Sequence, residues 1–221
     1  MSADVNLLIL DLDHTLFDPE TIPRGVMEPA FDRVREAHRQ VGGLSREALE
    51  ASIAELMGAP ISLVAAKYGW PDSVRQVCLE ATAEATLPSA LPVYPDVAAI
   101  VDLPCRKVLV TTGVPAVQWQ KVEATGVGAW LDGVHVDDVL AVPRRGKKAV
   151  FGTVLAEEGV ARETAVVVGD RLESEIAAGN ALGLRTVHVA RNGCDAACPA
   201  TYCVPDLEAM VLRLWKRGGA R

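Results

Sequence analysis

The sequence predicts an α/β protein: a doubly wound, Rossmann-like parallel sheet with an all-helical domain inserted into it. Two observations predict this class. Short apolar runs rich in Val, Leu and Ile alternate with amphipathic stretches, which is the pattern of buried parallel strands joined by helices. After the first of these runs, helical periodicity alone continues for about 75 residues.

The apolar runs place the strands at residues 5–10, 107–110, 133–136, 165–168 and 185–189. Helices are predicted between them. In the helix predicted over residues 148–158, one face carries Val150, Phe151, Val154 and Leu155. The last helix has apolar residues at i, i+3, i+4 and i+7, namely Leu207, Met210, Val211 and Leu214.

The inserted domain is predicted to be a helical cap over residues 18–91, and the core domain is formed by residues 1–17 and 92–221. Three apolar stripes with helical spacing begin near residues 26, 49 and 74, and a fourth short helix is expected at 61–68. Proline-bearing segments, "FDPETIP" and "LPSALPVYP", flank the insert as linkers would.

Composition excludes several classes of function. The chain has 221 residues, half of them apolar, with 22 basic and 29 acidic residues and a net charge of -7. Outside the short "KRGGAR" tail there is no extended basic cluster, so nucleic acid and anionic membranes are not expected partners. No apolar run approaches the roughly 18 residues of a membrane span. We therefore expect a cytoplasmic protein. We also expect it to be a monomer or a homodimer.

The five cysteines are an odd number in a chain long enough to fold without disulfides, so all are expected to be reduced. Three of them, Cys194, Cys198 and Cys203, lie within ten residues. Their spacing, C-x3-C-x4-C, matches no common zinc or iron–sulfur pattern. We expect them to be ordinary loop cysteines.

Two carboxylates, Asp11 and Asp13, end the most hydrophobic predicted strand in "LLILDLDHTL". In a doubly wound sheet, ligands bind beyond the carboxyl ends of the strands. An aspartate there can simply cap a turn. Two acids this close repel each other unless a cation is bound or one stays protonated, so their joint presence favours chemistry.

Other polar groups are predicted at the same edge of the sheet. Hydroxyls and a flexible backbone follow the second strand in "TTG", at Thr111, Thr112 and Gly113. Acids follow the fourth strand in "GDRLESE", at Asp170 and Glu175. Two lysines, Lys147 and Lys148, precede the helix that contains Phe151. An acid pair, hydroxyls, a lysine and a further acid at one edge indicate a common site.

That order resembles the four motifs of the haloacid dehalogenase superfamily of phosphohydrolases, over about residues 5–190. "DLDHTL" is similar to its first motif (DxDxT), "VLVTTG" to its second, Lys147 in "GKKAVF" to its third and "VVVGDRLESE" to its fourth. The helical insert after the first motif is similar to the C1 cap of the family.

The resemblance implies a phosphatase that acts on a small phosphorylated metabolite. Asp11 would attack phosphorus to give an aspartyl-phosphate, and Asp13 would act as general acid and then as general base. Thr111 and Lys147, with Thr112 and Gly113, would bind the phosphoryl oxygens. Lys147 is preferred to Lys148 because Lys148 would start the helix and could point to solvent.

The resemblance also implies a Mg²⁺ cofactor, held by the Asp11 side chain, the Asp13 backbone carbonyl and the Asp170 carboxylate. Glu175 is the further predicted metal residue. It stands where the fourth motif often has aspartate, which leaves direct and water-mediated metal contact both open.

Four alternatives share the fold. A metal-free dehalogenase normally lacks the second aspartate, and a phosphonate-cleaving enzyme needs a cap lysine, for which Lys67 is the sole residue of that type in the insert. A phosphomutase uses the same acids but excludes water better. A phosphate sensor would bind without turnover. Mg²⁺-dependent release of phosphate would discriminate the hydrolase from the sensor.

Overall fold

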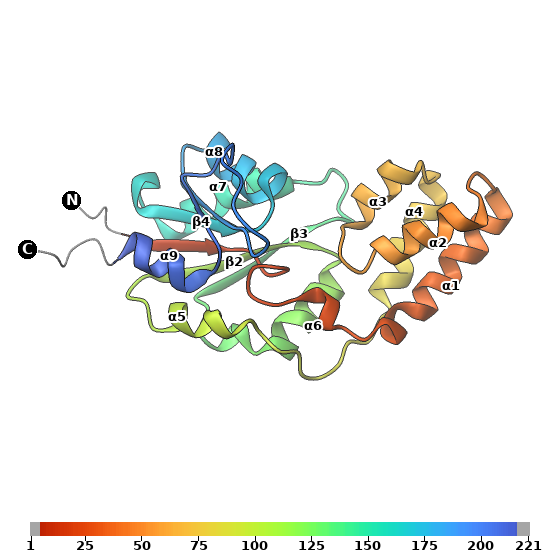
Figure 1. Ribbon diagram of the computed structural model, residues 1–221, viewed down its shortest axis with the longest axis horizontal. Coiled ribbons are helices and arrows are strands. Elements are labelled where there is room, and N and C mark those ends of the chain that lie inside the picture. The colour runs from red at the N-terminus through yellow and green to blue at the C-terminus, as the bar shows by residue number, and fades with distance from the viewer. Residues whose placement is uncertain (1–4, 216–221) are drawn as a thin grey trace, which may run out of the picture. The chain divides into compact units, whose positions relative to one another are not determined.

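The computed structural model in Figure 1 describes residues 5–215. The chain forms two compact units, each built from separate stretches. The first consists of Met1–Asp18, Pro92–Thr112 and Thr125–Arg221, and the second of Pro19–Leu91 and Gly113–Ala124. The second unit therefore includes a segment, 113–124, that falls within the predicted core domain.

The first unit is built on a six-stranded sheet in the order β3-β2-β1-β4-β5-β6. The pairs β1–β2, β1–β4, β4–β5 and β5–β6 are parallel. The strands are β1 (Leu7–Leu10), β2 (Arg106–Gly113), β3 (Gly133–Asp138), β4 (Ala165–Gly169), β5 (Arg185–Val189) and β6 (Tyr202–Val204). The chain winds outward from β1 in one direction and from β4 in the other, so the predicted doubly wound α/β fold is confirmed.

Helices cover both faces of the sheet (Figure 1). One face carries α7 (Gly146–Glu158) and α8 (Ala177–Ala181), and the other carries α5 (Ala98–Val101) and α9 (Leu207–Leu214). Every residue of β1 and β4 is buried, which explains their unbroken apolar sequences. Leu7 and Ile9 of β1 share a core cluster with Val150, Phe151 and Val154 of α7.

The predicted strands differ from the structure in two ways that matter for the site and its surroundings. β2 continues to Gly113, so the "TTG" residues are the end of the strand and not a loop after it. β6 was not predicted, because three residues are too few to show an alternating or continuous apolar pattern. It forms because the chain after residue 201 lies parallel to β5, with His188 opposite Cys203.

The second unit is helical and has its own core. Its helices are α1 (Arg24–Val41), α2 (Arg46–Glu55), α3 (Ile61–Tyr68), α4 (Asp72–Ala83) and α6 (Pro115–Thr125). The buried cluster centres on Phe31, Val34, Ile53, Val64 and Trp70. The Trp70 indole N–H donates a hydrogen bond to Ser52 Oγ at 3.1 Å, so the one polar atom of that side chain is satisfied inside the core.

Helix α6 joins this unit through the segment that leaves the insert. Gln120 Oε1 accepts a hydrogen bond from the Leu87 N–H at 2.8 Å, and Gln120 Nε2 donates one to the Ala85 carbonyl at 3.0 Å. The Leu91 N–H donates to the Ala124 carbonyl at 2.9 Å. Apolar periodicity in a sequence does not reveal hydrogen bonds between a glutamine and backbone groups more than thirty residues away. The sequence therefore predicted that this helix belongs to the core domain.

The remaining helical segments are single turns. They are Pro19–Thr21, Pro95–Val97, Val127–Ala129, Arg162–Thr164 and a π-turn at Leu172–Ile176. Among the helices formed by residues 5–215, none has the length and apolar character needed to cross a bilayer.

The cysteines differ from expectation. Cys194 and Cys203 form a disulfide, with their Cα atoms 5.8 Å apart, so the prediction of five reduced thiols was wrong for this pair. Cys78, Cys105 and Cys198 are free. The two cysteines can pair because the chain between β5 and β6 turns back and brings Cys194 beside β6, which carries Cys203.

Phe31→Ala should destabilise the helical unit, because Phe31 is 2% exposed and its loss leaves a cavity among close-packed side chains. The expected decrease in the free energy of unfolding is about 3–5 kcal/mol. Leu63→Ala is the control, because Leu63 is 45% exposed, and should cost about 0.5 kcal/mol. Urea denaturation followed by circular dichroism measures both. Equal losses would contradict the assigned core.

Candidate active site

The register of β1 and β4 brings two acids to the same edge of the sheet. Leu10 pairs with Val168, and the Asp11 N–H donates a hydrogen bond to the Val168 carbonyl at 2.9 Å. Asp11 is the first residue after β1, and Asp170 is the first after β4. Both side chains therefore leave neighbouring strands at their carboxyl ends, where loops of a doubly wound sheet converge.

Lys147 lies between two carboxylates. It is the second residue of α7, and only 4% of its side chain is exposed. Its Nζ lies 2.5 Å from Asp11 Oδ1 and also contacts Glu175 Oε1. Lys148, one position on, is exposed. The helix start thus directs one lysine of the pair inward and the other to solvent.

Glu175 is positioned by the π-turn that follows β4. Its carboxylate accepts hydrogen bonds from the Arg171 N–H at 3.1 Å and the Ser174 hydroxyl at 2.8 Å, in addition to Lys147. The side chain folds back over Gly169, where a Cβ atom would lie 2.5 Å from Glu175 Cγ. The glycine before Asp170 is therefore required by the approach of the glutamate, which explains the "GD" dipeptide.

We call Asp11, Asp170 and Glu175 the acidic cluster; their pKa values differ with their surroundings. Burial raises the pKa of Asp11 well above its usual range, although Lys147 opposes the shift. Burial and the charge of Glu175 raise the pKa of Asp170 to about 6. Burial also acts on Glu175, but the charge and hydrogen bond of Lys147 outweigh it and lower its pKa. For Lys147, burial is outweighed by the two carboxylates, which raise its pKa.

The acidic cluster fits a hard divalent cation. One ammonium group faces three carboxylates, and one oxygen from each carboxylate lies within 4.8 Å of the others. Asp170 Oδ1 is buried and accepts no hydrogen bond from residues 5–215. A buried acceptor without a donor is costly, and an oxygen-only donor set is the kind that Mg²⁺ prefers. A cation here would satisfy the orphaned oxygen and balance the excess negative charge.

A tight turn holds Asp13 close to Asp11. The Leu12 carbonyl accepts hydrogen bonds from three successive N–H groups, of Thr15, Leu16 and Phe17. His14 has a φ of 57°, in the left-handed region that non-glycine residues rarely adopt. Asp13 itself is half-buried and forms a β-bridge with Phe17. The chain turns sharply here, so Asp13 stays at the strand end and does not continue outward.

The predicted phosphate-binding residues of β2 separate into three environments. Thr111 is fully buried in the strand. The Thr112 hydroxyl donates a hydrogen bond to Asp137 Oδ2 at 3.1 Å. Gly113 belongs to the second unit, and a Cβ there would lie 2.9 Å from Gln118 Cδ. The structure therefore assigns Thr112 a supporting contact that the sequence did not indicate.

Sequence reasoning missed Asp137, the fully buried acid near the end of β3. Its carboxylate accepts hydrogen bonds from the Arg144 guanidinium at 2.6 Å and from the Gly146 N–H at 2.9 Å, besides Thr112. It thereby links the end of β2 to the start of α7, where Lys147 lies. A signal existed, because the aspartate directly follows the predicted strand 133–136 at the functional edge of the sheet.

Sequence reasoning also missed Arg191, which follows β5. Its guanidinium donates hydrogen bonds to the carbonyls of Thr15 at 2.7 Å and His14 at 3.2 Å, and to the carboxylate of Asp96. It also stacks over the Tyr94 ring, 3.6 Å from the centroid. These contacts hold the turn after β1 from outside, so Arg191 fixes the position of Asp13 through the backbone.

Asp137→Ala should lower the free energy of unfolding by roughly 2–4 kcal/mol, because the Thr112 hydroxyl and the Gly146 N–H lose their acceptor. Asp138→Ala is the matched control. It removes one exposed hydrogen bond, to the Leu140 N–H, and should cost about 1 kcal/mol. Urea titration of both variants measures the difference, and similar losses would show that Asp137 does not brace the site.

Comparison with known proteins agrees with this geometry. The profile of the haloacid dehalogenase-like hydrolases matches residues 5–183. A glyceraldehyde 3-phosphate phosphatase from Methanopyrus kandleri is 32% identical over 100 residues, which are 45% of this chain and 42% of that protein. This chain therefore aligns with less than half of that relative.

Several solved structures share the fold over nearly their whole length. The haloacid dehalogenase-like protein SP0104 from Streptococcus pneumoniae has a TM-score of 0.65 at 16% identity, covering 96% of this chain and 99% of that one. A HAD phosphatase from Thermococcus onnurineus has a TM-score of 0.61 at 22% identity, with coverage of 98% and 99%. YfnB from Bacillus subtilis, described as a HAD-hydrolase bound to magnesium, has a TM-score of 0.61 at 17% identity, with coverage of 96% and 99%. Together with the match over residues 5–183, these findings mean that the chain belongs to the haloacid dehalogenase-like hydrolases.

Proposed function

We propose that this protein is a Mg²⁺-dependent phosphatase that hydrolyses a small phosphomonoester through an aspartyl-phosphate on Asp11. One observation carries the proposal. Asp11, Lys147, Asp170 and Glu175 come from three separate segments of the chain, yet they share one buried cluster at the carboxyl edge of the sheet. Family membership and the phosphatase relative support the same reaction class.

Asp11 is the proposed nucleophile. Its carboxylate forms a bond to phosphorus while the bond from phosphorus to the leaving oxygen breaks, and water then cleaves the aspartyl-phosphate to release inorganic phosphate. The nucleophile must be ionised. Because burial raises the pKa of Asp11, the positive charge of Lys147 and of a bound cation is needed to keep it in that form.

Asp13 is the proposed proton carrier. It donates a proton to the leaving oxygen in the first displacement and accepts one from the attacking water in the second. Such acid–base assistance is worth roughly 10²–10⁴ in rate. The turn closed by the Leu12 carbonyl and held by Arg191 supports this role, because it fixes the backbone that follows the proposed nucleophile and carries Asp13.

Lys147 and Thr111 are the proposed ligands of the transferring phosphoryl group. Lys147 is buried and charged, and a preorganised ammonium stabilises charge that develops on the equatorial oxygens. Thr112 and Gly113 complete the proposed end of β2 that faces the phosphoryl group. The hydrogen bond from Thr112 to Asp137 would orient the end of β2. Thr111, and not Thr112, would then be the hydroxyl that binds the phosphoryl group.

Asp11 and Asp170, with the Asp13 backbone carbonyl, would hold Mg²⁺. When bound, the cation supplies positive charge to the phosphoryl oxygens and lowers the pKa of Asp11. Glu175 contributes through its negative charge and by holding Lys147, since Lys147, Arg171 and Ser174 already donate to its oxygens. The longer glutamate side chain suits this bracing role as well as a water-mediated contact.

The proposed substrate is a small phosphorylated metabolite. The archaeal relative is named for glyceraldehyde 3-phosphate, which makes three-carbon phosphorylated aldehydes the first compounds to test on this chain. A panel of sugar phosphates, nucleotides and phosphoglycolate would rank the substrates.

Phosphatase activity is tested by p-nitrophenyl phosphate turnover with Mg²⁺ and with EDTA. We expect release of nitrophenol that requires Mg²⁺, and a loss of at least about 10⁴-fold in kcat for Asp11→Asn, which keeps the shape but cannot attack phosphorus. Asp102→Asn, an exposed acid after α5, should retain full activity. An active Asp11→Asn variant, or binding of phosphate without turnover by the wild type, would overturn the proposal.

The two adjacent lysines provide a second test. Lys147→Ala should lower kcat by about 10²–10³-fold, because a preorganised charge at the phosphoryl group is lost. Lys148→Ala should change kcat by less than about threefold, since Lys148 is exposed. Circular dichroism of both variants checks folding. A larger loss for Lys148→Ala would place the phosphate beside the other lysine.

A further inference from the structure

We propose that His188, Cys194, Cys198 and Cys203 form a zinc site when the Cys194–Cys203 disulfide is reduced. These four residues, the thiol–imidazole cluster, lie on β5, on β6 and in the connection between them. They lie outside the acidic cluster and take no part in the proposed phosphatase reaction. The proposal concerns a soft-ligand site, whereas the acidic cluster offers only oxygen.

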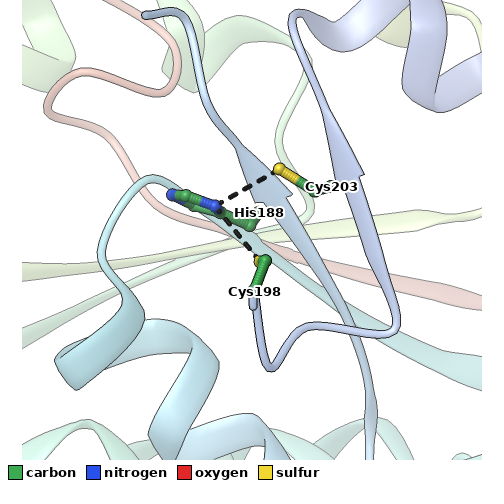
Figure 2. Close-up of side chains that lie close together, drawn as sticks. All are labelled: His188, Cys198 and Cys203. Atoms are coloured by element: carbon green, nitrogen blue, oxygen red, sulfur yellow. Dashed lines mark hydrogen bonds between the residues drawn. The ribbon is translucent and has the colours of Figure 1, made fainter. Parts of the chain in front are cut away.

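The first observation is the convergence of ligand atoms. Cys198 Sγ lies 3.5 Å and Cys203 Sγ lies 3.6 Å from the same imidazole nitrogen, His188 Nδ1. Figure 2 shows the two sulfurs approaching that nitrogen from different directions, one from β6 and one from the loop. In a tetrahedral zinc site with Zn–S of about 2.3 Å and Zn–N of about 2.0–2.1 Å, nitrogen and sulfur lie about 3.5–3.6 Å apart. Both nitrogen–sulfur distances therefore already match those of a zinc ligand set.

The second observation concerns the other nitrogen of the ring. His188 Nε2 lies 2.9 Å from the backbone carbonyl oxygen of Asp170. A carbonyl only accepts hydrogen bonds, so Nε2 carries the proton and Nδ1 presents its lone pair to the sulfurs. Zinc-bound histidines almost always donate their second N–H to a carbonyl or carboxylate in this way. The imidazole is thus oriented and in the tautomer that binds metal.

Backbone structure holds the ligands in place. His188 and Cys203 are paired residues of the parallel strands β5 and β6. Cys198 sits in a turn where its N–H donates to the Asp195 carbonyl at 3.1 Å, and Asp195 Oδ1 accepts the Ala197 N–H at 2.8 Å. Cys194 is bonded to Cys203, so its sulfur adjoins the group formed by His188, Cys198 and Cys203, and reduction frees it to become the fourth ligand. Three sulfurs and one nitrogen make the Cys3His set of structural zinc sites.

The disulfide and the zinc site exclude each other. Reduction by a trialkylphosphine breaks the S–S bond: phosphorus takes oxygen from water and becomes the phosphine oxide, and the two water protons pass to the sulfurs. Zn²⁺ then binds three thiolates and the neutral imidazole, and three protons are released. In the oxidised protein, Cys194 and Cys203 are occupied by each other, and only His188 and Cys198 remain as ligands.

Metal binding is tested on the full chain, reduced with a phosphine, freed of metal by a chelator and kept in excess Mg²⁺ so that oxygen ligands are occupied. Co²⁺ is titrated first, because thiolate ligands give a sulfur-to-cobalt charge-transfer absorption that carboxylates do not. We expect one equivalent to bind and one equivalent of Zn²⁺ to displace it, with nanomolar or tighter affinity for Zn²⁺. The oxidised protein should show no such absorption.

Variants identify the ligands. Cys198→Ser and His188→Gln should each weaken Zn²⁺ binding by at least about 100-fold. Cys105→Ser is the matched control, because Cys105 is a free thiol next to β2, which β1 and β4 separate from β5, and should bind as the wild type does. Absence of the charge-transfer band in the reduced wild type, or equal binding by the oxidised protein, would overturn the proposal without need of a variant. Phosphatase activity enters none of these readouts, so this proposal can fail independently of the other.

Discussion

The site of this protein depends on one buried ammonium group. Lys147 joins the carboxylates of Asp11 and Glu175, which come from segments far apart in sequence. Without its charge, the three acids that follow β1 and β4 would repel one another, and burial would drive protons onto them. The positive charge of Lys147 balances the negative charge of the site only in part, because Asp170 adds a third carboxylate. A site that keeps its carboxylates close together and retains an excess of negative charge attracts a divalent cation.

The topology explains why these groups meet. Because β1 and β4 are neighbours in a parallel sheet, the residues that follow them emerge side by side. Helix α7 then returns to the same edge and presents Lys147 in its first turn. Around this centre, Asp137 binds the start of α7 and Arg191 binds the turn after β1. Asp137 and Arg191 thus hold the segments that carry the site residues, and neither is itself a member of the acidic cluster.

The acidic cluster and the thiol–imidazole cluster share a residue. The Asp170 carboxylate belongs to the first, while the Asp170 carbonyl accepts the hydrogen bond that orients His188 in the second. One cluster offers hard oxygen ligands and the other soft sulfur and nitrogen, so the two select different metals. A metal in the second cluster would hold β5, β6 and their connection against the backbone of a residue in the first. The proposed zinc site would therefore stabilise the edge of the sheet that carries the proposed active site.

The sequence by itself determined the fold class, because buried parallel strands and amphipathic helices have different apolar periods, and each is visible locally. It also indicated Asp11, Lys147, Asp170 and Glu175 as a set, since strand ends share an edge in this topology. Only the tertiary structure decided which lysine turns inward, that α6 joins the helical unit and that His188 meets the cysteines. Those outcomes depend on helix phase, on a Gln120 contact across the chain and on a three-residue strand, and none of these leaves a periodic signal. Contacts between distant segments are set by packing, which local pattern does not record.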